Sequence, residues 1–195
     1  MSGPTHAPPW RVGAAAVAVA VAALVATGCS HGDGAPSVLA AGEKEPRGIT
    51  VTSPAFDSGG AVPERFSCEG LNVPPPLAWT GVPDGATELA LVIEDPGAPD
   101  GTFVHWLVLG VDPASKGLRG ADPPAGAEVL PGSSDNPTYI GPCPPDGDGV
   151  HRYYFEVYAL GRRPAIDPSA SPVDNVRAVR KAAVAGGWLI GTFTR

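Results

Sequence analysis

Short apolar runs alternate with turn-forming stretches along most of this chain. Residues 88–94 contain the run Leu-Ala-Leu-Val-Ile, which is typical of a central strand buried on both faces. Residues 103–111 and 153–160 are almost as continuous. Weaker strand signals lie at residues 49–53, 77–79 and 188–194. The pattern predicts a mainly β domain of the β-sandwich type.

One segment near the C-terminus has helical periodicity instead. Residues 172–185 carry Asp174 near their start, and the apolar positions that recur at helical spacing are Val176, Val179, Ala183 and Val184. Gly186 and Gly187 follow, and because glycine commonly ends helices, we expect the helix to stop there. Residues 56–76 and 112–138 are expected to be mostly turn and loop.

The N-terminus is typical of an export signal. Residues 1–11 are polar with one cation, and residues 12–28 are almost entirely Ala, Val, Gly and Leu without charge, as in a secretory signal. The small residues at 26–28 precede Cys29, which resembles the bacterial lipobox, although Ala26 stands where leucine is more common. We therefore expect a signal peptide at residues 1–28 and lipidation of Cys29.

An ordinary secretory signal and an N-terminal membrane helix are the alternatives, although the run is shorter than the ~20 residues a span prefers. Residues 29–48 are small, polar and aperiodic, which favours a flexible tether. The domain proper is expected at residues 49–195. On this interpretation the protein is exported and lipid-anchored to the cell membrane, facing outside the cytoplasm.

Composition narrows the class of partner. The 195 residues carry a net charge of −7, and no cluster of Lys and Arg stands out that could bind nucleic-acid phosphates. We therefore expect no nucleic-acid partner. The 26 glycines and 24 prolines alternate with compact apolar runs, which favours a loop-rich β protein over a disordered one.

Two clusters carry the candidate chemistry. Residues 94–99, Glu-Asp-Pro-Gly-Ala-Pro, precede His105, and residues 139–145, Tyr-Ile-Gly-Pro-Cys-Pro-Pro, precede His151. Each cluster places a histidine on an apolar strand beside a loop that proline makes stiff. These are the two histidines of the domain beyond the tether. The pairing suggests one shared pocket.

The residue types in these clusters suit a small anion. Histidine donates N–H bonds and can be cationic near neutral pH, and Asp95 can accept from a ring N–H and favour the charged form. Tyr139 and Tyr153 can supply hydroxyl groups or a wall. The backbone N–H groups of Gly141 and Cys143 are expected to be free to point at an anion. The alternative is that both histidines are ordinary core residues with satisfied hydrogen bonds.

These clusters resemble the signature regions of the phosphatidylethanolamine-binding protein family, which includes the Raf kinase inhibitor protein. Residues 67–70, 75–79 and 191–195 resemble its bacterial branch, so the likeness runs from about residue 49 to the end. Gly97 departs from the pattern, because the family usually has a second aspartate there.

The resemblance implies a β-sandwich-type domain whose pocket binds small anions, such as phosphate or phospholipid head groups, without a cofactor or metal and without catalysis. It assigns the pocket to Asp95, His105, Tyr139, Gly141, Cys143, Pro145, His151 and Tyr153. It also implies that the domain can inhibit or regulate a protein target.

Three other functions stay open at this point. The first is an inhibitor of a kinase or protease in which the pocket is secondary. The second is a metal triad of two histidines and a carboxylate, although the close spacing of the usual zinc motifs is absent. The third is a hydrolase that uses Ser133 or Ser134 near His151, although the chain has no Gly-x-Ser-x-Gly motif.

The cysteine count predicts a disulfide bond. Apart from Cys29, the chain has two cysteines, Cys68 and Cys143. In a protein sent to an oxidising compartment, such a pair is more often bonded than free. The bond would tie the front of the domain to the loop at residues 139–145. Two free buried thiols are the alternative.

Overall fold

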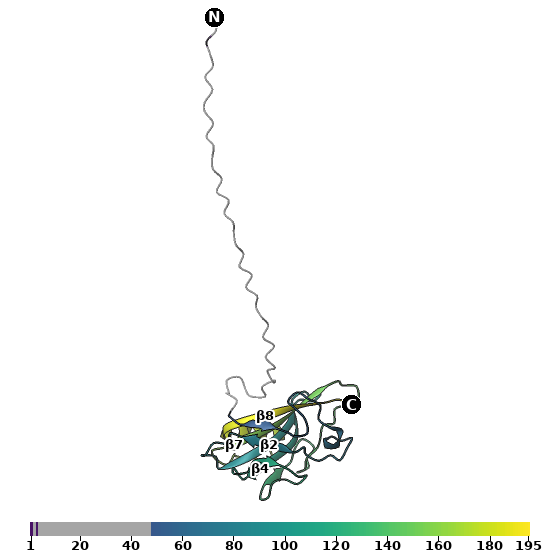
Figure 1. The fold of residues 1–195 in the computed structure, drawn as a ribbon, viewed down its shortest axis with the longest axis vertical. Helices are drawn as coiled ribbons and strands as arrows, with labels where there is room; N and C mark the ends of the chain where they lie inside the picture. Colours follow the sequence, from purple (N-terminus) through teal and green to yellow (C-terminus); the bar gives the residue numbers. More distant parts are fainter. Residues whose placement is uncertain (2, 4–47) are drawn as a thin grey trace. The chain divides into compact units, whose positions relative to one another are not determined.

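The computed structural model describes residues 1, 3 and 48–195 of the chain (Figure 1). The predicted signal peptide at 1–28, the lipidation site Cys29 and the tether at 29–48 lie almost wholly outside the described residues. Among the described residues, no helix is long and apolar enough to span a membrane.

A five-stranded antiparallel sheet forms the centre of the domain, in the order β6-β4-β3-β7-β8. Its middle strand, β3 (Glu88–Asp95), is buried at all eight positions, as its continuous apolar run predicts. The other strands are β4 (Phe103–Val111), β6 (Glu128–Leu130), β7 (His151–Leu160) and β8 (Ala183–Phe193). The pairing of β3 with both β4 and β7 brings the ends of these three strands together.

A smaller antiparallel sheet covers one face of the large one. It consists of β1 (Thr50–Thr52), β2 (Leu77–Thr80) and β5 (Gly117–Leu118), with β2 in the middle. The main core cluster includes Trp79 of the small sheet and Trp106 and Phe155 of the large one. The predicted mainly β, sandwich-type fold is therefore confirmed.

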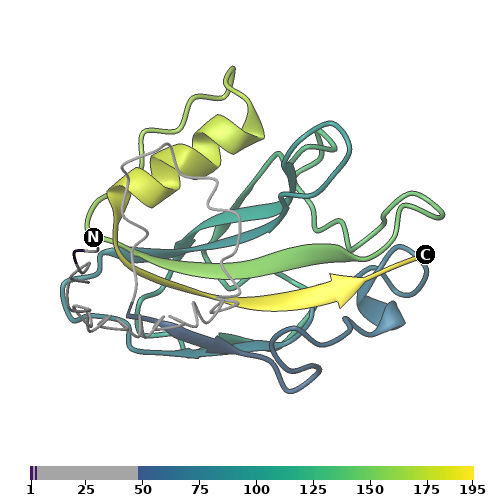
Figure 2. The ribbon, with the colours of Figure 1, turned by 90° about the horizontal axis from the view of Figure 1, so that it is seen from above.

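Helix α1 (Pro172–Ala182) lies on the opposite face of the large sheet, as the yellow-green helix in Figure 2 shows. The Ser171 side chain caps its start by accepting from the Asp174 backbone N–H at 3.1 Å. Val176 and Val179 are fully buried in a second apolar cluster between helix and sheet. A short 3-10 helix, η1 (Glu64–Phe66), lies in the predicted turn region before β2.

The predicted helix end is wrong. Helix α1 stops at Ala182, and Gly186 and Gly187 lie inside β8, paired with Tyr158 and Val157 of β7. At Gly187 an added Cβ would lie 1.9 Å from the Ile49 carbonyl oxygen. The glycine therefore serves close backbone packing, a role that a sequence pattern cannot separate from helix termination. The short strands β5 and β6 also lie within the predicted loop 112–138.

Candidate functional site

The large sheet brings four of the predicted site residues together. Asp95 ends β3, His105 lies in β4, and His151 and Tyr153 lie in β7. The ring centroid of Tyr153 is 5.2 Å from that of His105 and 6.4 Å from that of His151. One tyrosine ring therefore contacts both histidines, as expected if the two clusters form one site.

His151 is held between two carboxylates. Its Nδ1 donates to Asp95 Oδ2 at 2.6 Å, and its Nε2 donates to Asp148 Oδ2 at 3.1 Å. The second oxygen of Asp95 accepts the Gly97 backbone N–H at 2.8 Å. Burial alone would lower the pKa of His151, but the hydrogen bonds and charges of Asp95 and Asp148 outweigh it and raise the pKa. The two carboxylates therefore favour the cationic form of His151.

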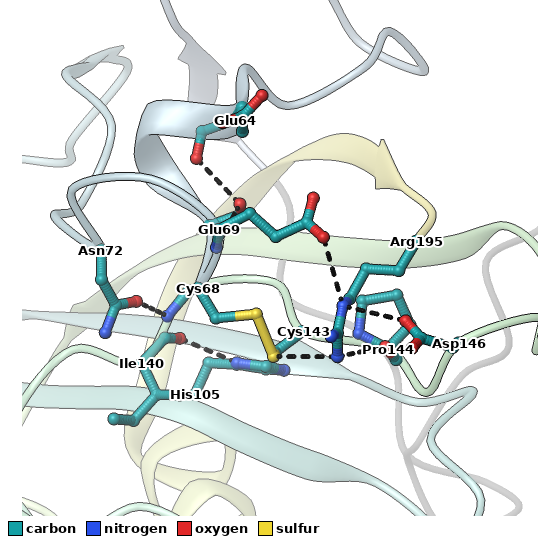
Figure 3. The surroundings of a disulfide bond; sticks show 12 residues. Glu64, Cys68, Glu69, Asn72, His105, Ile140, Cys143, Pro144, Asp146 and Arg195 are labelled. Atoms are coloured by element: carbon teal, nitrogen blue, oxygen red, sulfur yellow. Dashed lines mark hydrogen bonds and ion pairs between the residues drawn. A yellow bond between two sulfur atoms is a disulfide. The ribbon is translucent and has the colours of Figure 1, made fainter.

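His105 behaves differently. It is 5% exposed, and its Nδ1 donates to the Ile140 carbonyl oxygen at 2.8 Å (Figure 3). Burial lowers the pKa of His105 to about 4 and outweighs the bonds to backbone carbonyl groups, which act in the other direction. His105 is therefore neutral at pH 7 and anchors the loop at residues 139–145 to β4.

Three of the loop residues predicted to face a ligand are used inside the domain. The Tyr139 hydroxyl donates to the Phe66 carbonyl oxygen at 2.7 Å, and the Gly141 N–H donates to Asn72 Oδ1 at 2.7 Å. The backbone N–H of Cys143 hydrogen-bonds to the Tyr153 hydroxyl group. The expectation that the Gly141 and Cys143 donors are free is therefore wrong, because these groups join the loop to its neighbours.

The predicted disulfide is present. Cys68 and Cys143 are bonded, with their Cα atoms 5.5 Å apart, and the Cys68 N–H donates to the Pro142 carbonyl oxygen at 3.1 Å. Figure 3 shows Arg195 beside this bond, where its Nε lies 3.3 Å from both Glu69 Oε1 and Asp146 Oδ1. The segment before β2, the loop and the C-terminal residue thus meet at one place.

A cavity of about 260 Å³ opens beside His151. Its wall is formed by Pro96, Gly97, Asp148, Val150, His151, Arg152 and Tyr154. Of the predicted site residues, His151 lines this cavity, whereas Pro145 is exposed and accepts the Asp148 backbone N–H. Asp148 was missed by sequence reasoning, because an Asp-Gly-Asp-Gly stretch indicates only a turn.

The geometry bears on the other chemistries that the sequence left open. Ser133 Oγ accepts the Val104 backbone N–H at 2.9 Å, and both ring nitrogens of His151 contact carboxylates. Among residues 48–195, no group of three or more His, Cys, Asp and Glu side chains is arranged to hold a metal ion.

A second polar cluster lies under helix α1. Arg180 Nη2 donates to Glu94 Oε1 at 2.6 Å and to Glu156 Oε2 at 2.9 Å, and its Nε donates to the Tyr158 hydroxyl at 2.9 Å. All four side chains are buried. Charged residues within the apolar strands were the signal for this cluster, since a buried charge needs a partner.

Comparisons with known proteins agree with the fold. The family model described as phosphatidylethanolamine-binding protein matches residues 52–194. The Mycobacterium tuberculosis protein LppC, named as a candidate lipoprotein, is 43% identical over 145 residues, which are 74% of this chain and 72% of LppC. A UPF0098 protein of Mycobacterium bovis is 39% identical over 184 residues, covering 88% of each chain.

Solved structures agree as well. The crystal structure of YbcL from E. coli, described as a new member of the mammalian PEBP family, superposes with a TM-score of 0.69. The two sequences are 27% identical, and the match covers 75% of this chain and 98% of YbcL.

Proposed function

This chain belongs to the phosphatidylethanolamine-binding protein family, and on that premise we propose that its domain binds small anions, such as phosphate or phospholipid head groups, without turning them over. The observation that carries the proposal is His151. It is a buried side chain with a raised pKa, and it lies in the wall of the cavity. A charge-assisted hydrogen bond from such a cation to a phosphoryl oxygen is about twice as strong as a neutral one.

The two histidines have separate roles in this proposal. Nδ1 of His151 is committed to Asp95, so Nε2 is the ring N–H that can bind a ligand. His105 stays neutral and holds the loop through Ile140. Arg152 lines the same cavity and adds a second positive charge. Since no serine hydroxyl contacts His151 among the described residues, the arrangement supports binding rather than hydrolysis.

Titration with phosphorylethanolamine tests this function. We expect the His151 ring signals in NMR to shift at millimolar ligand, with smaller shifts for His105, and we expect His151→Gln to weaken binding at least tenfold, since it removes the cationic donor. Circular dichroism checks that the variant is folded, and a phosphate-release assay checks for turnover. A His151 signal that stays unchanged throughout the titration, or release of phosphate by the wild type, would contradict the proposal.

We also propose that the protein is exported and anchored by a lipid on Cys29. The support is the uncharged apolar run that ends in small residues at Cys29 and the lipoprotein name of LppC. Wild-type protein is expected to partition into the detergent phase of a Triton X-114 extraction, and Cys29→Ser to move to the aqueous phase. Ser30→Ala is the matched control and should partition like wild type. If Cys29→Ser stays in the detergent phase, the anchor is not this lipid.

A further inference from the structure

The carboxylate of Asp148 occupies the ring N–H through which His151 would bind a ligand. Its Oδ2 lies 3.1 Å from Nε2 of His151, and both residues line the cavity of about 260 Å³. The other ring nitrogen, Nδ1, is bonded to the buried Asp95 at 2.6 Å. An anion that approaches His151 through the cavity therefore meets a site that already holds an anionic group.

The contact between Asp148 and His151 lies at the surface, in a segment that can move. The side chain of Asp148 is 44% exposed, whereas that of Asp95 is 3% exposed. Ion pairs at exposed positions contribute little stability, since water screens them. Gly147 and Gly149 flank Asp148 with φ angles of +80° and +90°. Because glycine adopts both signs of φ readily, the segment can move Asp148 away without strain in its neighbours.

We propose that Asp148 is an internal competitor that sets the affinity of this site for anions. The inference rests on the proposed anion-binding function of His151. A ligand binds only when the carboxylate has left, so its apparent Kd is the intrinsic value divided by the fraction of open molecules. If Asp148 is in place about nine-tenths of the time, that factor is about ten.

The competition acts on every anion alike, because each anion can bind only the open molecules. Acetate has the same functional group as the Asp148 side chain. Asp148, however, is tethered beside His151, at an effective concentration on the order of millimolar. A free carboxylate therefore has no advantage over the tethered one. A phosphate group brings more acceptor oxygens and, as a dianion, more charge. Phosphate is therefore expected to displace Asp148 at a lower concentration than acetate does, although loss of Asp148 tightens the binding of each by the same factor.

The test compares Asp148→Ala with Asp146→Ala, which removes the same charge from the same segment. The side chain of Asp146 is 82% exposed and lies 3.3 Å from Arg195 Nε rather than at His151. Inorganic phosphate and acetate are titrated at about pH 6, below the ordinary pKa of histidine, because loss of Asp148 lowers the His151 pKa. We expect Asp148→Ala to bind both anions about tenfold more tightly, and Asp146→Ala to change each Kd less than about twofold.

The outcomes separate this inference from the proposed function. If wild type binds phosphate and Asp148→Ala binds it no more tightly, Asp148 is not a competitor, and the anion-binding function stands. If neither protein binds phosphate at tens of millimolar, both proposals fail. Binding by Asp148→Ala alone supports the competitor. As a second readout, the NMR-determined pKa of His151 should fall in Asp148→Ala, and an unchanged pKa would show that the contact is absent in solution.

Discussion

Replacing Cys68 and Cys143 together by serine is expected to lower the free energy of unfolding by about 4 kcal/mol. The disulfide joins residues 75 apart in the sequence. In the chain-entropy account, a bond across such a long segment acts mainly by restricting the unfolded chain. Urea unfolding followed by tryptophan fluorescence measures the change. A Cys29→Ser background keeps a third thiol out of both preparations.

Reductant provides the matched control for this prediction. Reducing the disulfide in the parent protein should shift its unfolding midpoint to that of the double serine variant. The same reductant should leave the serine variant unchanged. If the parent and the double variant unfold at the same urea concentration, the bond contributes no net stability, and strain or residual structure in the unfolded chain offsets the entropy term.

The serine variant is nevertheless expected to keep the shape of the loop at residues 139–145. Three hydrogen bonds join the loop to residues 66–72 independently of the sulfur atoms, through Tyr139, Gly141 and Pro142. His105 adds a fourth bond from β4 through the Ile140 carbonyl. The disulfide therefore secures an arrangement that polar contacts already specify, and its loss affects stability more than the geometry at His151.

The motif spacing was informative about which residues meet. It predicts a common location for Asp95, His105 and His151, and the structure places them at adjoining strand ends. The cysteine count predicts the Cys68–Cys143 bond, which the structure contains. These features follow from local patterns, namely a histidine on an apolar strand and an even cysteine count. The ligand-binding role of these residues stays a prediction.

The sequence could not predict which partners the polar groups of the loop would bond to, or that Asp148 would contact His151. From the sequence alone, the backbone N–H groups of Gly141 and Cys143 could bind either a ligand or another part of the domain. Only the fold shows that they contact Asn72 and Tyr153. Asp148 has no motif that marks it, because its meeting with His151 depends on the path of a glycine-rich turn. Burial acts to lower the pKa of both histidines, but the two pKa values move in opposite directions because the fold gives His105 a backbone carbonyl partner and His151 two carboxylate partners, and periodicity does not reveal these partners.

The buried polar cluster under helix α1 contains two glutamates from the apolar strands β3 and β7. Glu94 and Glu156 are 1% and 5% exposed, so each loses hydration that only hydrogen bonds can replace. Arg180 is the cation that contacts both, and the attraction of Glu156 raises its pKa further above the ordinary value, against the effect of burial. Two carboxylates facing one cation titrate as a coupled set.

Replacing Arg180 by methionine is expected to lower the free energy of unfolding by about 3–5 kcal/mol at pH 7, because it leaves a buried carboxylate without its cation and removes the hydrogen-bond donor that Glu94 and Glu156 share. Methionine keeps most of the apolar stem of arginine, so lost packing contributes little. Arg177→Met is the matched control on the same helix. Its side chain is 48% exposed and pairs with the exposed Asp174, so the expected change is less than about 1 kcal/mol.

The same cluster predicts how stability depends on pH. Burial, together with the charge of Glu94, raises the pKa of Glu156 to about 8 from its ordinary value of 4.5. The folded state therefore holds this proton more tightly than the unfolded state. The resulting stabilisation is complete below the ordinary pKa and is lost as the pH rises through about 8. Glu156→Gln keeps the neutral form at every pH, so the variant should gain stability relative to wild type across this window.

Urea unfolding of wild type and Glu156→Gln at a series of pH values measures that gain, and the difference between the two proteins removes the contributions of His105, His151 and the exposed carboxylates. Arg180→Met combined with Glu156→Gln should be more stable than Arg180→Met alone, because the folded state no longer has to hold a proton on Glu156. A constant difference between pH 5 and about 8.5 would mean that Glu156 is ionised throughout and that Arg180 alone sets its charge.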